Sequence, residues 1–188
     1  MVLKPAPDTP GLAAIFGELA VEAGLPAGVL NVVFGSDPAM AGEMLVDDPR
    51  IDLISFTGST ATGRRIAERG GKGLKRVFLE LGGKSAKIVF EDVPNFAQEV
   101  GASMVIAHAG QGCAIMTRLL VPRSRYGEAV EALRAAYGAF GDKWGDFDDP
   151  GQVMGPVVNA RQLERVMEYI GIGVAEAATL LAGGKRRP

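Results

Sequence analysis

Short apolar runs alternate along the chain with stretches whose apolar residues recur at helical spacing. The runs predict strands at 2–3, 29–34, 51–56, 75–81, 86–90, 118–122 and 179–184. The helical spacing predicts helices that start at Thr9-Pro10, at Asp37-Pro38, over 61–69, over about 95–112, from Tyr126 to Phe140 and after a cap at Asn159. Because helices separate strands that are apolar at nearly every position, we expect an α/β fold with an open parallel sheet covered on both faces.

The chain is expected to divide at Gly82-Gly83, where two glycines follow the third long strand pattern. The first part opens inside a strand, and the second stops directly after one, at Arg186-Arg187-Pro188. Both parts are therefore expected to lack pieces of a larger sheet.

Composition narrows the classes of partner. The chain has 188 residues, of which 47% are hydrophobic, and its 20 basic and 22 acidic side chains leave a net charge of -2. No basic stripe marks a nucleic-acid or lipid surface, and no apolar run is long enough for a signal peptide or a membrane span. One cysteine rules out an internal disulfide framework, and no His/Cys cluster suggests a metal. We expect a cytoplasmic protein that binds a small molecule.

The stretch "FTGSTATG" places Gly58 and Gly63 between a strand and a helix. Unpaired N–H groups and the positive end of the helix dipole at such a turn suit a diphosphate. The spacing matches neither the dinucleotide fingerprint nor the Walker pattern. The alternative is a tight turn with a glycine for helix–strand packing.

Two charged residues stand at predicted strand ends. Lys4 could reach a phosphate or a ribose hydroxyl, because ligands of open α/β sheets bind at the carboxyl ends of the strands. Glu80, beside glycines and after an apolar run, would be a stronger base if it were buried, and could act as a general base. The alternatives are a solvated lysine and a surface glutamate.

Cys113 is the only cysteine and follows Gly110-Gln111-Gly112 in a predicted passage from loop to helix. A thiol near a helix N-terminus ionises more readily and is a better nucleophile. A buried structural cysteine is the alternative. His108, five positions earlier, is interpreted as a packing residue, because that spacing does not reliably place an imidazole against the thiol.

Four stretches together resemble the NAD(P)-dependent aldehyde dehydrogenase superfamily. "LKPAPDTP", "FTGSTATG", "LELGGKS" and "GQGC" occur in the order and at the separations of that family, and "TRLLVPRSRY" and "GPVVNARQ" are similar to its catalytic-domain segments. The resemblance implies part of a Rossmann-like cofactor-binding domain over 1–81 and part of an α/β catalytic domain over 82–188, without a metal.

The resemblance also implies a chemistry. Cys113 would be the nucleophile, whose thiolate adds to an aldehyde to give a thiohemiacetal; hydride transfer to the nicotinamide then leaves a thioester. Glu80 matches the general base that activates the hydrolytic water, so the product would be a carboxylic acid. The backbone N–H of Cys113 would be one donor to the oxyanion.

The cofactor contacts follow in the same way. Lys4 matches the contact to the adenosine ribose or 2′-phosphate, Ser59 the pyrophosphate contact, and Leu81 a backbone neighbour of the nicotinamide. Gly58 and Gly63 would let the cofactor approach. Pro7 stands where NAD-preferring relatives often carry a glutamate, so the cofactor is expected to be NAD or NADP.

Family members are more than twice as long, and the resemblance implies that a second oxyanion donor, a glutamate for the nicotinamide ribose and an association hairpin lie outside this sequence. We therefore expect a portion of the enzyme that is weakly active or inactive alone, and a homo-oligomer in the full-length form. One rival is a non-catalytic scaffold or interaction module with the same fold. Another is an acyl-phosphate reductase, which would not require Glu80.

Overall fold

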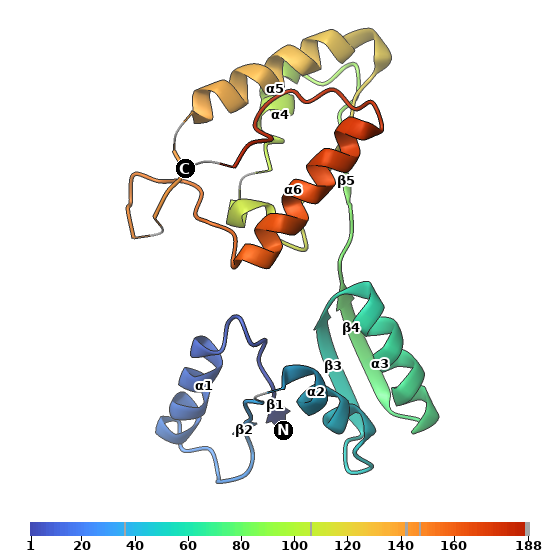
Figure 1. Ribbon diagram of the computed structural model, residues 1–188, viewed down its shortest axis with the longest axis vertical. Helices are drawn as coiled ribbons and strands as arrows, with labels where there is room; N and C mark the ends of the chain where they lie inside the picture. The colour runs from blue at the N-terminus through green and yellow to red at the C-terminus, as the bar shows by residue number, and fades with distance from the viewer. Residues whose placement is uncertain (36, 106, 142, 147, 187–188) are drawn as a thin grey trace. The chain divides into compact units, whose positions relative to one another are not determined.

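The computed structural model describes residues 1–35, 37–105, 107–141, 143–146 and 148–186. The chain divides into two compact units, Met1–Gly82 and Gly83–Pro188. Among the described residues, the first unit carries two parallel strand pairs and the second carries one, each with helices of its own (Figure 1).

The first unit contains two strand–helix–strand arrangements. Strand β1 (Val2–Leu3) pairs in parallel with β2 (Asn31–Val32), and helix α1 (Gly11–Glu22) lies between them in sequence. Strand β3 (Leu53–Gly58) pairs in parallel with β4 (Arg76–Leu81), with α3 (Thr60–Lys72) as the connecting helix. Helix α2 (Pro38–Asp47) joins the two arrangements. The parallel pairing is the one that helix-separated strands predict.

Two helix starts show how local sequence sets the element bounds. At α2 the Asp37 side chain accepts hydrogen bonds from the backbone N–H groups of Ala39 and Met40, both at 3.0 Å, as expected for an aspartate cap. At α1 the cap residue is Pro10 and no side chain caps the helix, so the expected Thr9 cap is wrong.

Helix α3 covers one face of β3 and β4 (Figure 1). A Cβ atom added to Gly70 would lie 2.8 Å from Val77 Cγ2, so the helix backbone approaches the strand closely there. Successive strand residues point to opposite faces, and on the other face Leu53 and Phe78 remain 48% and 59% exposed. Within this unit α3 covers one face of the β3–β4 pair, and the other face is exposed.

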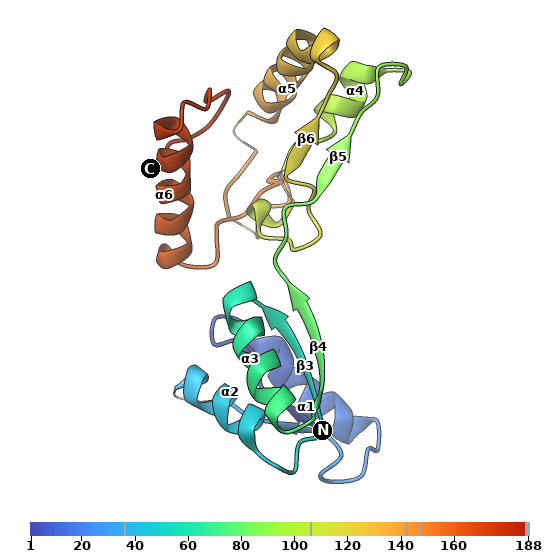
Figure 2. The same cartoon turned by 90° about the vertical axis from the view of Figure 1, so that its right-hand side faces the viewer.

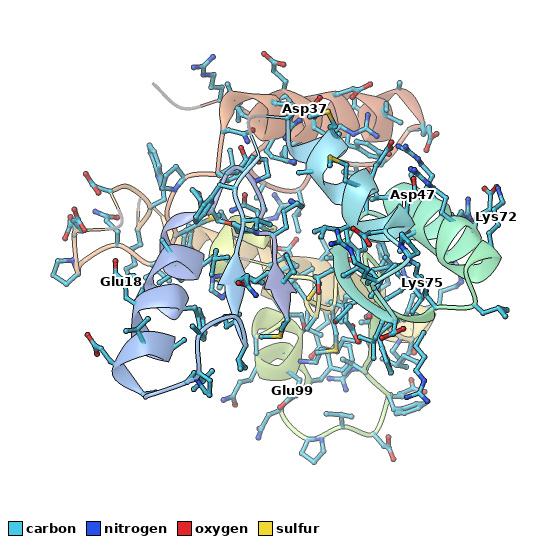
Figure 3. The ribbon with its side chains drawn as sticks, turned by 90° about the horizontal axis from the view of Figure 1, so that it is seen from below. Glu18, Asp37, Asp47, Lys72, Lys75 and Glu99 are labelled. Atoms are coloured by element: carbon cyan, nitrogen blue, oxygen red, sulfur yellow. The ribbon has the colours of Figure 1, made fainter. Side chains whose placement is uncertain are left out.

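Ion pairs join α2 to α3. Arg69 pairs with Glu43 at 3.2 Å and also with Asp47, and Arg65 pairs with Glu43. The labelled Asp47 lies on the side of α2 that faces α3 (Figure 3). These contacts are exposed to solvent, so they orient the two helices more than they stabilise them.

The second unit is built on a third parallel pair. Strand β5 (Ala86–Ile88) pairs with β6 (Arg118–Leu120), and α4 (Phe96–Gly101) lies between them in sequence (Figure 2). A turn with left-handed backbone, η1 (Ala107–Gly110), and a short 3₁₀ helix, η2 (Arg123–Arg125), precede α5 (Tyr126–Phe140) and α6 (Ala160–Ala175). The core consists of Val89, Phe96, Val100 and Ala129.

Three expectations about elements are wrong. Among the described residues of the first unit, β1–β2 and β3–β4 form two separate pairs, where a single open sheet was expected. The stretch 179–184 is not a strand, and Gly183 and Gly184 have φ of 71° and 75°, which an extended strand does not accommodate. The helix expected over 95–112 ends at Gly101, where the Ser103 hydroxyl donates to the Glu99 carbonyl at 3.0 Å.

In the part of the chain that the structure describes, no helix is long and apolar enough to cross a bilayer.

Candidate functional site

The carboxyl ends of β3 and β4 bring four of the predicted site residues together. The parallel register sets Thr57 opposite Glu80 and Gly58 opposite Leu81. Ser59 follows Gly58 directly and is the cap of α3. A strand end beside a helix N-terminus is where open α/β sheets bind ligands.

Ser59 shapes the start of α3. Its hydroxyl accepts a hydrogen bond from the Thr62 backbone N–H at 3.2 Å and donates one to the Thr62 hydroxyl at 2.9 Å. Gly58 and Ser59 are both exposed. The first N–H groups of any helix lack intrahelical partners, so this exposed turn can present backbone donors to an anion.

Side chains lie close to both Gly58 and Gly63. A Cβ atom on Gly63 would lie 2.6 Å from Leu81 Cδ2, and one on Gly58 would lie 2.4 Å from Phe56 Cζ. Gly63 is buried between α3 and β4. The structure thus realises the helix–strand packing alternative, which is compatible with the close approach of a ligand to the exposed Gly58.

Lys4 follows the other parallel pair of the unit, β1 and β2. Its side chain is half-buried, and Nζ donates a hydrogen bond to the Pro5 carbonyl at 2.8 Å. Its Cε atom would lie 3.7 Å from a Cβ on Gly42, which places the lysine stem beside α2. Lys4 is therefore neither free in solvent nor part of the β3–β4 edge.

Glu80 is exposed, on the strand face that does not contact α3. In the unit described Glu80 has the surface position that the sequence left open as an alternative, and its neighbours on that face are themselves exposed. What Glu80 retains is its position at the carboxyl end of β4, beside Thr57.

Cys113 lies in a turn between η1 and β6, and its thiol is free and exposed. No helix begins after it, so the expected passage into a helix is wrong, and a buried structural cysteine is wrong as well. His108 is also exposed and has a φ of 49°, so its interpretation as a packing residue is not supported.

Gln111 is a residue of this loop to which the sequence analysis assigned no role. Its side-chain amide donates to the His108 carbonyl at 2.9 Å and accepts from the Val158 backbone N–H at 3.0 Å. A polar side chain between two glycines in "GQGC" was the only available signal, because the partner lies 47 positions away in sequence.

The predicted site residues are divided between the units. Lys4, Gly58, Ser59, Gly63, Glu80 and Leu81 belong to the first unit, and Cys113 belongs to the second. Among the described residues, no group of three or more His, Cys, Asp or Glu side chains could hold a metal ion.

The sequence matches the Aldehyde dehydrogenase family over residues 1–188. The mitochondrial aldehyde dehydrogenase of Leishmania tarentolae is 44% identical over 99% of this chain, which covers 37% of that relative. A crystal structure of aldehyde dehydrogenase from Bartonella henselae superposes with a TM-score of 0.92 at 38% identity, over 100% of this chain and 39% of that one. The Mycobacterium tuberculosis aldehyde dehydrogenase complexed with NAD+ gives a TM-score of 0.90 at 44% identity, over 99% and 38%.

The chain thus spans less than two fifths of the length of each of these relatives. The match nevertheless extends over every stretch that carries the predicted site, and the structural likeness confirms the α/β fold class. The chain belongs to the aldehyde dehydrogenase family.

Proposed function

We propose that this chain carries the nucleophile and the general base of an NAD(P)-dependent aldehyde dehydrogenase that oxidises an aldehyde to a carboxylic acid. The observation that carries the proposal is the free, exposed thiol of Cys113, in a turn of a chain that matches the family throughout. The relatives named above are themselves aldehyde dehydrogenases, which supports an aldehyde as the small-molecule substrate.

The first unit fits a dinucleotide. An exposed strand-to-helix turn at Gly58 and Ser59 offers backbone donors to a pyrophosphate, and Gly63 lets α3 pack close to Leu81. Lys4 would contact the adenosine ribose or its 2′-phosphate. When bound, NAD or NADP would supply the hydride acceptor. The relative complexed with NAD+ supports the assignment of 1–81 to a cofactor-binding domain.

Cys113 would carry the covalent chemistry in the catalytic portion, 82–188. Its thiolate sulfur bonds to the carbonyl carbon of the aldehyde, and the oxygen takes up negative charge in the thiohemiacetal. The Cys113 backbone N–H would donate to that oxygen. Loss of hydride leaves an acyl group on sulfur as a thioester.

Glu80 would complete the turnover. Its carboxylate takes a proton from water as the water oxygen bonds to the thioester carbon, and the carbon–sulfur bond then breaks to return the thiolate. The exposed position of Glu80 at the end of β4 supports this role, since a base must reach solvent water. An acyl-phosphate reductase would not need this carboxylate.

An interaction module is the second candidate, and exposed apolar side chains favour it. On α1, Leu12 is 76% exposed, Phe16 58% and Leu19 50%. Uncovered apolar faces of this kind favour association, so they also support a homo-oligomer of the full-length form. The unpaired cysteine supports a reducing, cytoplasmic location.

Alkylation of Cys113 distinguishes the enzyme from the module. Because the thiol is the only one, iodoacetamide labels a single site that mass spectrometry reads directly. We expect rapid labelling at neutral pH that is slowed by an aldehyde, and no labelling of Cys113→Ser. Ala114→Ser, which adds a hydroxyl beside the intact thiol, is the matched control. Slow labelling that neither aldehyde nor cofactor changes would favour the module.

A further inference from the structure

The backbone before Cys113 adopts a conformation that needs support. His108, Ala109 and Gly110 have φ of 49°, 53° and 76°, so three consecutive residues occupy the left-handed region. For residues with a Cβ atom this region is sparsely populated and persists only where surrounding contacts hold it. Something must therefore hold the turn that leads to the thiol.

Gln111 provides that support with its backbone N–H and both polar atoms of its side-chain amide. Its backbone N–H donates to the His108 carbonyl at 3.0 Å, and its side-chain Nε2 donates to the same oxygen at 2.9 Å. Two donors on one carbonyl close the left-handed turn. The side-chain Oε1 accepts from the Val158 N–H at 3.0 Å.

The hydrogen bond from the Val158 N–H to Gln111 Oε1 connects the turn to the start of α6. Val158 precedes Asn159, the cap of that helix, whose side chain accepts from the Gln162 N–H at 2.9 Å. A capped helix end is a defined anchor. The Gln111 side-chain amide thus connects the His108 carbonyl, five residues before the thiol, to the residue that precedes the cap of α6.

We propose that Gln111 is the positioning residue of the Cys113 nucleophile: its amide bridges the His108 carbonyl and the Val158 N–H and so holds the turn that carries the thiol. The proposal rests on the proposed function, since only a reacting thiol needs a fixed place. Gln111 itself takes no part in bond making.

The test is acylation of Cys113 by p-nitrophenyl acetate in the 188-residue chain. The sulfur bonds to the acetyl carbon, the bond to p-nitrophenolate breaks, and the thiol proton goes to solvent. Gln111→Met preserves side-chain length and removes both side-chain hydrogen bonds. Gln98→Met, at an exposed position on α4, is the matched control.

For Gln111→Met we expect the maximal acylation rate to fall about 10- to 100-fold, because small displacements of a reacting group have effects of that order. The ester concentration at half-saturation should stay unchanged, which separates positioning from binding. Hydrogen exchange at the Val158 amide should accelerate. Gln98→Met should match the original chain in all three measurements.

Gln111→Glu separates the two bonds, because it retains an acceptor for Val158 and removes the donor to His108. We expect Val158 protection to persist while the acylation rate stays below that of the original chain. If Gln111→Met loses protection throughout α4 and α5, it has unfolded the unit, and Gln111→Glu decides the question.

Two results would overturn the proposal: acylation of either folded variant at the original rate, or unchanged Val158 exchange in Gln111→Met. Failure of the original chain to acylate at Cys113 would instead count against the proposed function. Exchange at Val158 would still report whether the Gln111 bond exists, so the two failures are distinguishable.

Discussion

The proposed chemistry depends on two side chains, those of Cys113 and Glu80. Each is exposed for a different local reason. Cys113 is exposed because a turn carries it between η1 and β6. Glu80 is exposed because alternate residues of β4 point away from α3. Residue type and order in the sequence predicted both as candidates, but their surroundings could not be predicted, since burial depends on what packs against each face.

Glu80→Gln tests the general base. The amide cannot take a proton from water, so we expect acylation of Cys113 by p-nitrophenyl acetate to proceed while deacylation slows about 10²–10⁴-fold. Mass spectrometry should show the acetylated chain accumulating to one equivalent. Glu18→Gln, at an exposed position on α1, is the control and should behave as the original chain. Undiminished turnover in Glu80→Gln would favour the acyl-phosphate reductase.

At the scale of elements, the contact between α3 and β4 fixes the strand end that carries Glu80. Gly63 and Gly70 let the helix lie against Leu81 and Val77. The spacing of "FTGSTATG" predicted a strand, a turn and a helix, and the structure has all three. Which glycine touches which strand residue could not be predicted, because that depends on how the helix is placed on the sheet.

Two glycines of α3 offer a matched pair of substitutions. In Gly63→Ala the new Cβ would collide with Leu81, whereas in Gly71→Ala it would meet nothing within 4 Å. We expect Gly71→Ala to raise the free energy of unfolding by about 0.5–1 kcal/mol. The free energy of unfolding of Gly63→Ala should be about 1–3 kcal/mol lower than that of Gly71→Ala, because the added methyl group overpacks the contact with Leu81. Urea unfolding measures the free energy of unfolding of both variants. Equal values would contradict the close contact between Gly63 and Leu81.

The turn between α2 and β3 gives a pH prediction. The Arg50 side chain and backbone N–H donate to the Asp48 carboxylate, which holds the pKa of Asp48 well below its usual value. A carboxyl group whose pKa is lower in the folded chain than in the unfolded chain stabilises the fold at pH values above its unfolded pKa, about 3.9. That stabilisation is lost as the pH falls from there through the folded-state pKa.

We therefore expect Asp48→Asn to lower the melting temperature at neutral pH, with the difference shrinking as the pH falls below about 4. The effect should be small, because the pair is solvent-exposed. Asp52→Asn, at an exposed position nearby, is the control. A difference that stays constant with pH would contradict the assignment to the carboxylate.

At the scale of the whole molecule, the chain divides into two compact units, Met1–Gly82 and Gly83–Pro188. The core of Val89, Phe96, Val100 and Ala129 lies entirely within the second unit. In the first unit, buried apolar residues are few, and the exposed stripe on α1 shows that helical spacing alone does not decide whether a face is covered.

The division into two compact units predicts that each can lose stability on its own. Gly63→Val crowds Leu81 more than alanine does, so hydrogen exchange should accelerate across α3 and β4. Amides of α4 and α5 should keep the protection of the original chain, because their core shares no residue with that contact. Equal acceleration in both units would show that the chain unfolds as one cooperative body.

The sequence by itself determined the family, the parallel α/β class and the identity of the candidate side chains, because these follow from residue types, their order and short-range periodicity. Only the tertiary structure decided that β3 and β4 bring Gly58, Ser59, Glu80 and Leu81 to one edge. It likewise decided that Gln111 joins the Cys113 turn to Val158. The physical reason is that contacts between residues far apart in sequence, such as a hydrogen bond across 47 positions, form only when the elements pack together, whereas a local pattern reports on neighbouring residues.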